Sequence, residues 1–203
     1  MLNEWINPIY SDKKRINEIK NNFKASKPYP NFALSAFFNS SRLLKLRNEI
    51  IQEKFEKIEK DLFSLSHTKD LASSENKAIR DFHSFLSSKE FVLFMENLTG
   101  EKLSCRIDMQ SHIMEQGDYL LFHDDVVEGR SIAYIIYLET LNTRDGGKLR
   151  LYDVKKPLHP VKEIVPTFNT FACFKVSSKS LHDVEEVKSK KQRLTIGGWF
   201  YGY

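Results

Sequence analysis

The spacing of hydrophobic residues changes about halfway along the chain. In the first half it follows helical periodicity, and we predict one helix after the capping run 39–41, one that begins near residues 73–74, and one from residues 87–88 to a stop at Gly100. Residues 31–38 are predicted to be extended and residues 64–74 to form a polar loop. The aromatic residues Phe82, Phe85, Phe91 and Phe94 recur at helical spacing, which predicts that they pack in the core.

From Arg106 onward the period becomes two, which is typical of strands with one buried face. Ile107, Met109, Ser111 and Ile113 alternate with polar residues. Short apolar runs follow at residues 119–122, 132–138, 149–152, 171–176 and 194–200, and turn signals lie at residues 128–129, 145–147 and 157–166. We therefore predict an α+β fold that is mainly β, a sandwich or jelly roll with supporting helices at the N-terminal side.

Length and composition favour one folded unit. A chain of 203 residues supports a single sizeable core, and 41% hydrophobic with 29% charged residues is an ordinary globular balance. We predict a single domain over residues 1–203, with a helix-rich scaffold at 1–104 and a β-rich core at 105–203.

Charge and cysteine content narrow the partners and the compartment. The formal charge of +4 is spread along the chain, which is too mild to indicate a nucleic-acid partner. Cys105 and Cys173 have neither disulfide-framework nor zinc-site spacing, which favours a reducing compartment. No segment approaches a membrane-spanning apolar length, so we expect a cytoplasmic protein without a membrane partner.

The first candidate metal-binding residues follow the apolar run 119–122. His123 and Asp125 are two residues apart there. In an extended chain such residues point to the same side, so the imidazole and the carboxylate are expected to converge on one ion. Asp124 is expected to point away.

A second histidine, His182, lies in strand-like surroundings and would complete a face of two histidines and one carboxylate. Such a triad leaves the other positions around Fe(II) open for a co-substrate and dioxygen. Zinc also binds these ligand types and activates water, so a zinc hydrolase remains an alternative. Each fragment alone is common by chance, and what favours a site is their order along the chain.

Arg193 follows in the last apolar run and shares a strand face with Thr195. A guanidinium inside a β-barrel is costly unless it is paired, and a carboxylate would satisfy its fork of donors, with a hydroxyl alongside. The C5 carboxylate of 2-oxoglutarate is such a partner. The alternative is an arginine on a solvent-facing strand.

Together these residues resemble the prolyl 4-hydroxylase-like branch of the 2-oxoglutarate/Fe(II) oxygenases. Within that branch the chain is similar to the eukaryotic prolyl 3-hydroxylases that modify a small-subunit ribosomal protein. The segments that carry the resemblance are YLLFHDDV at 119–126, EGRSIAYIIYL at 128–138, GGKLRLY at 146–152, SLHDVEEV at 180–187 and RLTIGGWF at 193–200. Weaker similarity extends back through residues 61–63 and 30–32, so it covers most of the chain.

The resemblance implies a double-stranded β-helix in which His123, Asp125 and His182 ligate iron. It also implies that Arg193 binds 2-oxoglutarate with help from Tyr137 and Thr195. The implied cofactors are Fe(II) and 2-oxoglutarate, with ascorbate as an optional addition. The implied reaction uses dioxygen, releases succinate and carbon dioxide, and hydroxylates a target proline in a protein or peptide, a ribosomal protein included.

Two departures and several alternatives accompany this hypothesis. The family places a tyrosine nine residues before the first iron-binding histidine, where this chain has Met114. Eukaryotic members carry a second, degenerate jelly-roll domain after the catalytic one, whereas this chain stops at Tyr203. The identity of a ribosomal substrate is therefore left open. Nucleic-acid demethylases usually carry a second arginine where this chain has Trp199, which disfavours a nucleic-acid substrate. An oxygenase of a small molecule and a non-catalytic metal-binding interaction module remain alternatives.

Overall fold

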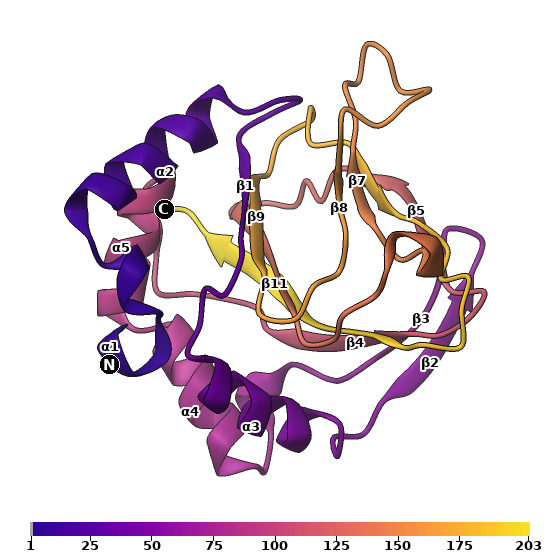
Figure 1. The fold of residues 1–203 in the computed structure, drawn as a ribbon, viewed down its shortest axis with the longest axis horizontal. Coiled ribbons are helices and arrows are strands. Elements are labelled where there is room, and N and C mark those ends of the chain that lie inside the picture. Colours follow the sequence, from indigo (N-terminus) through magenta and orange to yellow (C-terminus); the bar gives the residue numbers. More distant parts are fainter. Residues whose placement is uncertain (1) are drawn as a thin grey trace.

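A computed structural model describes residues 2–203, and its strands pair antiparallel in one long, curled sheet (Figure 1). The helices are α1 (Leu2–Trp5), α2 (Lys13–Ala25), α3 (Ser40–Ile50), α4 (Lys77–Leu86) and α5 (Lys89–Thr99), with 3-10 turns η1 (Pro8–Tyr10), η2 (Leu71–Ser73) and η3 (Thr143–Asp145). The strands are β1 (Asn31–Leu34), β2 (Glu56–Lys60), β3 (Phe63–His67), β4 (Gln110–Met114), β5 (Tyr119–His123), β6 (Arg130–Tyr137), β7 (Leu149–Leu151), β8 (Lys162–Ile164), β9 (Phe171–Lys175), β10 (His182–Val184) and β11 (Arg193–Tyr201).

The sheet order is β1-β9-β6-β11-β4-β3-β5-β10-β7-β8, with β2 paired to β3. The run β1-β9-β6-β11-β4 forms one layer, and β5-β10-β7-β8 forms the layer that faces it (Figure 1). Strand β3 joins the two layers because it pairs with both β4 and β5. At the other edge, Lys162 Nζ of β8 donates to Asn31 Oδ1 of β1 over 2.6 Å, so the barrel is nearly closed.

The helices lie on one side of the larger layer, and both ends of the described chain lie on that side (Figure 1). A cluster of aromatic rings fills the space between helices and sheet, with Phe37 stacked on Phe171 at 4.6 Å and Phe91 at 6.0 Å from Phe200. Burying rings of this size stabilises the fold by roughly 2 to 3 kcal/mol each. The predicted core residues Phe82, Phe85, Phe91 and Phe94 are all buried, which confirms that prediction.

Local signals in the sequence set the helix ends. Asn39 caps α3 by accepting from the backbone N–H of Arg42, and Ser88 caps α5 in the same way. Gly100 ends α5 with a φ of +79°, a conformation that glycine adopts without strain. The predicted start near residues 73–74 is wrong by a few residues, because Asn76 caps α4 and residues 71–73 form η2 instead.

The prediction of a polar loop at residues 64–74 is also wrong, because strand β3 occupies its first part. Ser64 and Ser66 make this strand look like a loop in sequence, yet its five residues are all half-buried between β4 and β5. The charged strand β2 pairs with it as a hairpin. Strand β8 lies within the stretch 157–166, where only turn signals were found in the sequence.

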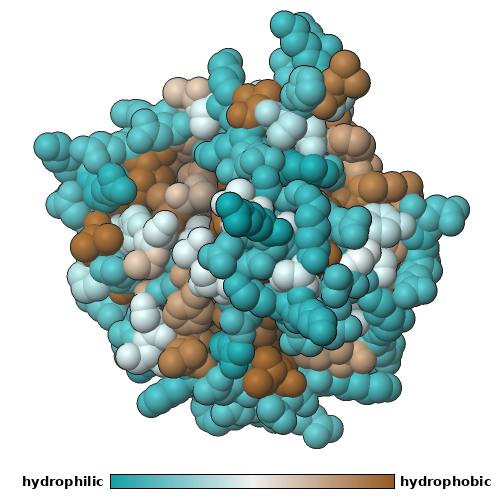
Figure 2. Space-filling view, turned by 45° about the vertical axis from the view of Figure 1, so that its right-hand side comes forward, coloured by the Kyte–Doolittle hydropathy of each residue, from teal (hydrophilic) through white to brown (hydrophobic). Residues whose placement is uncertain are grey.

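Seen from one side, the surface is dominated by hydrophilic side chains, with hydrophobic ones in separate patches (Figure 2). Within residues 2–203, no helix combines the length and apolar character needed to cross a membrane.

Candidate metal centre and carboxylate pocket

A cavity of about 170 Å³ lies between the two layers of the sheet. Strands β4, β6, β9 and β11 contribute one wall, and β5, β7 and β10 contribute the other. Five of the six predicted site residues line this cavity: His123, Asp125, His182, Arg193 and Thr195. The fold thus brings residues from distant parts of the sequence to one enclosed space.

His123, Asp125 and His182 form a cluster in which one ligand atom from each lies within 4.8 Å of the others. His123 is the last residue of β5 and His182 the first of β10, and the two are direct partners in the sheet register. Asp125 Oδ1 lies 3.5 Å from His123 Nε2, and Asp125 Oδ2 lies 3.4 Å from His182 Nε2. Both Nε2 atoms and the carboxylate therefore face one point.

The backbone orients both imidazole rings. His123 Nδ1 lies 2.8 Å from the carbonyl oxygen of Leu121, and His182 Nδ1 lies 2.7 Å from that of Ser180. A ring that donates through Nδ1–H keeps a lone pair on Nε2, which is the form that binds a metal. The two histidines are therefore oriented as ligands by hydrogen bonds to backbone carbonyls two residues earlier in the chain.

Asp125 converges on the histidines for a reason that differs from the prediction. Strand β5 ends at His123, and Asp125 has a φ of +64°, so an extended chain does not carry it there. Asp124 points away as expected, since it neither lines the cavity nor belongs to the ligand cluster. Its carboxylate accepts from the backbone N–H of Val126 over 3.0 Å. The carbonyl of Asp124 accepts from Ser180 Oγ over 2.7 Å, which ties this turn to the segment that leads into β10.

Burial keeps His182 neutral. It lowers the pKa of His182 to about 4, with the charge of His123 acting in the same direction and that of Asp125 opposing it. At neutral pH the ring is therefore unprotonated, as a metal ligand must be.

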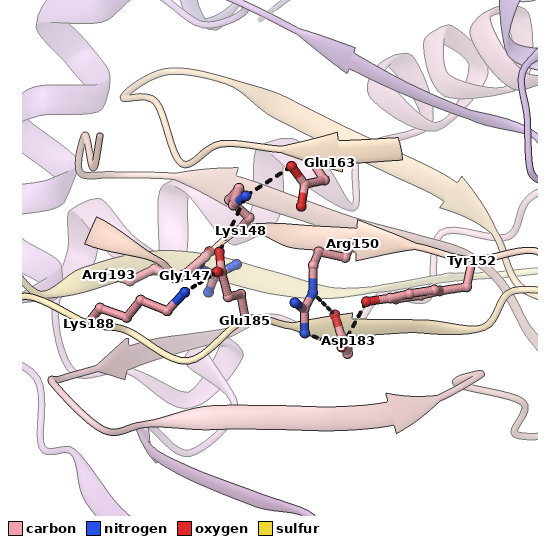
Figure 3. A network of polar contacts seen from close by, with 9 residues as sticks. All are labelled: Gly147, Lys148, Arg150, Tyr152, Glu163, Asp183, Glu185, Lys188 and Arg193. Atoms are coloured by element: carbon pink, nitrogen blue, oxygen red, sulfur yellow. Dashed lines mark hydrogen bonds and ion pairs between the residues drawn. The ribbon is translucent and has the colours of Figure 1, made fainter. Parts of the chain in front are cut away.

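Arg193 lies at the other end of the cavity and is 3% exposed. Its Nε donates to the carbonyl oxygen of Gly147 over 2.9 Å (Figure 3), and one Nη atom lies 3.7 Å from Met114 Sδ. Burial lowers the pKa of the guanidinium, but a guanidinium stays charged in proteins. Within residues 2–203 no carboxylate forms an ion pair with it, so the cavity holds a buried cation that lacks an anion.

Tyr137 and Thr195 accompany Arg193. They are direct partners between β6 and β11, and both are buried. The guanidinium carbon lies 5.3 Å from the centre of the Tyr137 ring, and the buried Tyr137 hydroxyl lies close to the guanidinium without a hydrogen bond of ordinary geometry to any described residue. Thr195 lines the cavity, whereas Tyr137 is not among the lining residues but has its ring next to the Arg193 guanidinium. All three residues predicted to bind 2-oxoglutarate are thus neighbours.

The residues fit a metal ion together with a dicarboxylic acid. Two histidines with free Nε2 atoms and one carboxylate form a three-ligand face that leaves further positions open. At the opposite end, the Arg193 guanidinium has no anionic partner among the described residues and the Tyr137 hydroxyl has no hydrogen bond of ordinary geometry to any of them, so both are free to bind a carboxylate. A zinc hydrolase would use the first set and leave the second without a role.

A polar network on the outer face of β7 and β10 was not anticipated from the sequence (Figure 3). Asp183 is 3% exposed and accepts from Arg150 Nε over 2.8 Å, from Arg150 Nη2 over 2.6 Å and from the Tyr152 hydroxyl over 3.2 Å. Asp183 directly follows His182 and points to the opposite face of the strand. The network therefore holds β10, the strand that carries one metal-binding histidine, against β7. The sequence signal for it was the alternation of charged and apolar residues in both strands.

Comparison with known proteins agrees with this geometry. Residues 109–201 match the 2OG-Fe(II) oxygenase superfamily. A prolyl 3-hydroxylase of Mus musculus is 36% identical over 181 residues, which covers 86% of this chain and 33% of the mouse protein. The chain therefore spans about a third of that relative's length.

Solved structures share the fold at low sequence identity. A prolyl-4-hydroxylase of Pseudomonas putida superposes with a TM-score of 0.75 at 15% identity, over 93% of this chain and 99% of that chain. A prolyl hydroxylase of Trichoplax adhaerens, in complex with a peptide from hypoxia inducible factor, gives a TM-score of 0.74 at 15% identity, over 96% and 92% of the two chains. This likeness confirms the predicted double-stranded β-helix with supporting helices.

Proposed function

Because residues 109–201 form a 2OG-Fe(II) oxygenase domain, we propose that the chain is an Fe(II)- and 2-oxoglutarate-dependent dioxygenase that hydroxylates a prolyl residue in a protein or peptide. The observation that carries the proposal is the buried, unpaired Arg193 in the same cavity as the three-ligand cluster. A metal-binding module without turnover has no need for this cation, because an unpaired buried charge costs stability.

In this proposal His123, Asp125 and His182 hold the iron through Nε2 atoms and a carboxylate oxygen. Arg193 anchors the far carboxylate of 2-oxoglutarate, with the Tyr137 and Thr195 hydroxyls as further partners. Fe(II) and 2-oxoglutarate together supply dioxygen activation, with succinate, carbon dioxide and a hydroxylated substrate as products. The residues of the chain orient the co-substrate and keep the site enclosed.

Apolar residues that are exposed beside the metal cluster support a polypeptide substrate. Val126 and Val127 are each 53% exposed just after Asp125. A peptide that brings a proline to the metal would cover these side chains. The prolyl specificity is proposed from the relatives, since one is named a prolyl 3-hydroxylase and one solved structure holds a peptide. A ribosomal protein is the first target to test.

The test is succinate formation from 2-oxoglutarate under air with added Fe(II), with and without proline-containing peptides, ribosomal sequences included. The wild type is compared with His123→Ala, with Arg193→Met and with Arg144→Met, a matched change in the exposed part of η3. We expect succinate that depends on iron, on His123 and on Arg193 but not on Arg144, and a peptide that gains one oxygen atom by mass spectrometry. Folded wild-type protein that forms no iron-dependent succinate would refute the oxygenase, and succinate without a modified peptide would redirect the search to small-molecule substrates.

A further inference from the structure

The roles proposed so far leave a titratable side chain of the cavity, that of His112, without a function. His112 lies on β4 and lines the cavity. Its direct partner in the sheet register is Thr195 of β11, two residues from Arg193. Side chains of residues paired in this way point to the same side of the sheet, so the His112 ring faces the space that Arg193 and Thr195 also face.

The ring lies between the two ends of the cavity. On β11 the cavity face carries Arg193, Thr195, Gly197 and Trp199 in succession. Trp199 is at the level of the metal cluster, because the register runs from Trp199 through Ala133 to Phe174, whose ring is 4.5 Å from that of His182. His112, opposite Thr195, is therefore placed between the level of Arg193 and the level of the metal.

Glycine at position 197 leaves room beside this ring. A Cβ atom added at Gly197 would lie 3.8 Å from both Cε1 and Nδ1 of His112. No side chain of β11 therefore separates the Nδ1 edge of the ring from the cavity. A ligand that spans the cavity from Arg193 to the metal cluster must pass this position.

The protonation state of His112 and the open hydrogen-bonding positions of its ring suit a bound carboxylate. Neither ring nitrogen makes a hydrogen bond within residues 2–203, so the ring leaves one donor and one acceptor open to a ligand in the cavity. Burial lowers the pKa of His112 to about 4, and the nearby charges of Arg193 and His67 act in the same direction. The ring is therefore neutral at pH 7, with one N–H to donate and no added positive charge beside Arg193.

Only one other residue of β4 lines the cavity, and it is no hydrogen-bond donor. Met114 faces Arg193 with its thioether, which carries no N–H or O–H group. His112 is thus the one donor that the cavity-lining side chains of β4 supply.

We propose that His112 donates a hydrogen bond to a carboxylate oxygen of 2-oxoglutarate and is therefore a further co-substrate-binding residue. The inference rests on the proposed function, because it takes 2-oxoglutarate as the ligand of the cavity. The co-substrate would then be bound by His112 on β4 as well as by Arg193 on β11.

The experiment measures binding and not turnover. Protein loaded with Mn(II), which replaces Fe(II) without reacting, is titrated by calorimetry with 2-oxoglutarate and with 2-oxopentanoate, which has a methyl group in place of the far carboxylate. The variants are His112→Ala, His112→Gln, which keeps an N–H donor, and His159→Ala in the exposed loop between β7 and β8 as the control. Thermal unfolding verifies that each variant is folded.

We expect His112→Ala to raise the Kd for 2-oxoglutarate about tenfold or more, as for loss of a hydrogen bond to a charged group. His112→Gln should stay near the wild type, and His159→Ala should match it. An equal loss for both ligands supports a bond to the carboxylate beside the oxo group, and a loss for 2-oxoglutarate alone supports a bond to the far carboxylate.

Two results would overturn the inference while leaving the proposed function intact. One is unchanged affinity of folded His112→Ala for both ligands. The other is an equal loss in the alanine and glutamine variants, because the donor would then be irrelevant. Failure of the wild type itself to bind 2-oxoglutarate with Mn(II) is a different outcome, and it would remove the proposed function together with the inference.

Discussion

The two ends of the cavity differ in how far the protein alone satisfies them. At the metal end, the ligands sit where β5 stops and β10 starts, and the His123 side chain is 30% exposed. Backbone carbonyls already satisfy both Nδ1 atoms. At the closed end Arg193 is 3% exposed, bonded to one carbonyl oxygen, and without a carboxylate partner in the described chain.

This difference indicates that the two ends of the cavity have different roles: one binds the metal and admits the substrate, and the other binds the co-substrate. The metal end is preorganised and accessible, so an ion and a substrate can reach it with little rearrangement. At the closed end the buried charge of Arg193 is unfavourable until a carboxylate pairs with it. Most of the free energy of co-substrate binding is therefore expected to come from this end. Changes at the metal end should therefore remove metal binding, and changes at the closed end should remove co-substrate binding while the metal still binds.

The largest effect is expected for Asp125→Asn. Asparagine tolerates the positive φ of this position but offers no negative charge, so Mn(II) affinity should fall by roughly 100-fold or more and succinate formation should be lost. Mn(II) binding is measured by electron paramagnetic resonance. Asp124→Asn is the matched control, because Asp124 points away, and a similar loss in both variants would contradict the assignment.

Arg193→Met should separate binding from stability. The variant should bind 2-oxoglutarate roughly 100-fold more weakly, because a desolvated charge pair is lost, and retain Mn(II) affinity. The ligand-free protein should be as stable as the wild type or more stable, since the substitution removes a buried unpaired charge. Calorimetry and chemical unfolding measure the two quantities, and a large loss of ligand-free stability would show that Arg193 is structural.

Gly146→Ala should disturb the closed end through the backbone. Its φ is +76°, and an added Cβ would lie 2.1 Å from the carbonyl oxygen of Glu186, while Gly147 next to it holds Arg193. We expect a loss of about 3 kcal/mol or more in the free energy of unfolding. Gly117→Ala, with a φ of +91° and no atom within 4 Å of the added Cβ, should cost only about 1 kcal/mol, and equal costs would refute the steric argument.

The smallest expected effect concerns pH. The pKa of His112 is lowered from 6.5 to about 4 in the folded protein, so the native state binds fewer protons than the unfolded state between these values. Its stabilising contribution is complete above pH 6.5 and is lost as the pH falls toward 4, by about 1 kcal/mol per pH unit. Unfolding of metal-free His112→Gln should show a shallower pH dependence than that of the wild type or His159→Gln. Identical slopes would contradict the lowered pKa.

The sequence predicts the fold best where burial imposes alternation. The second half alternates because one face of each strand lines the barrel, and its predicted runs correspond to β5, β6, β7, β9 and β11. Strand β3 escaped prediction because it is half-buried throughout and carries serines at positions 64 and 66, so no apolar face marks it. Pairing with β4 and β5 makes it a strand, and pairing partners cannot be read from local composition.

The candidate site divides in the same way. His123, Asp125 and His182 could be predicted because their residue types and order suit one ion, although the turn that places Asp125 could not. Tyr137 came only from family resemblance, since its local pattern is that of strand core. His112 gave no signal at all, because its importance depends on the strand register that sets it opposite Thr195.

The most direct test of a cavity with a metal at one end and a carboxylate at the other is a crystal structure with Mn(II) and 2-oxoglutarate. Anomalous scattering locates the metal, and the electron density places the co-substrate. We expect the metal to be bound by His123 Nε2, Asp125 and His182 Nε2, with the far carboxylate of 2-oxoglutarate on the Arg193 guanidinium. A metal bound elsewhere, or a co-substrate that does not reach Arg193, would contradict this expectation.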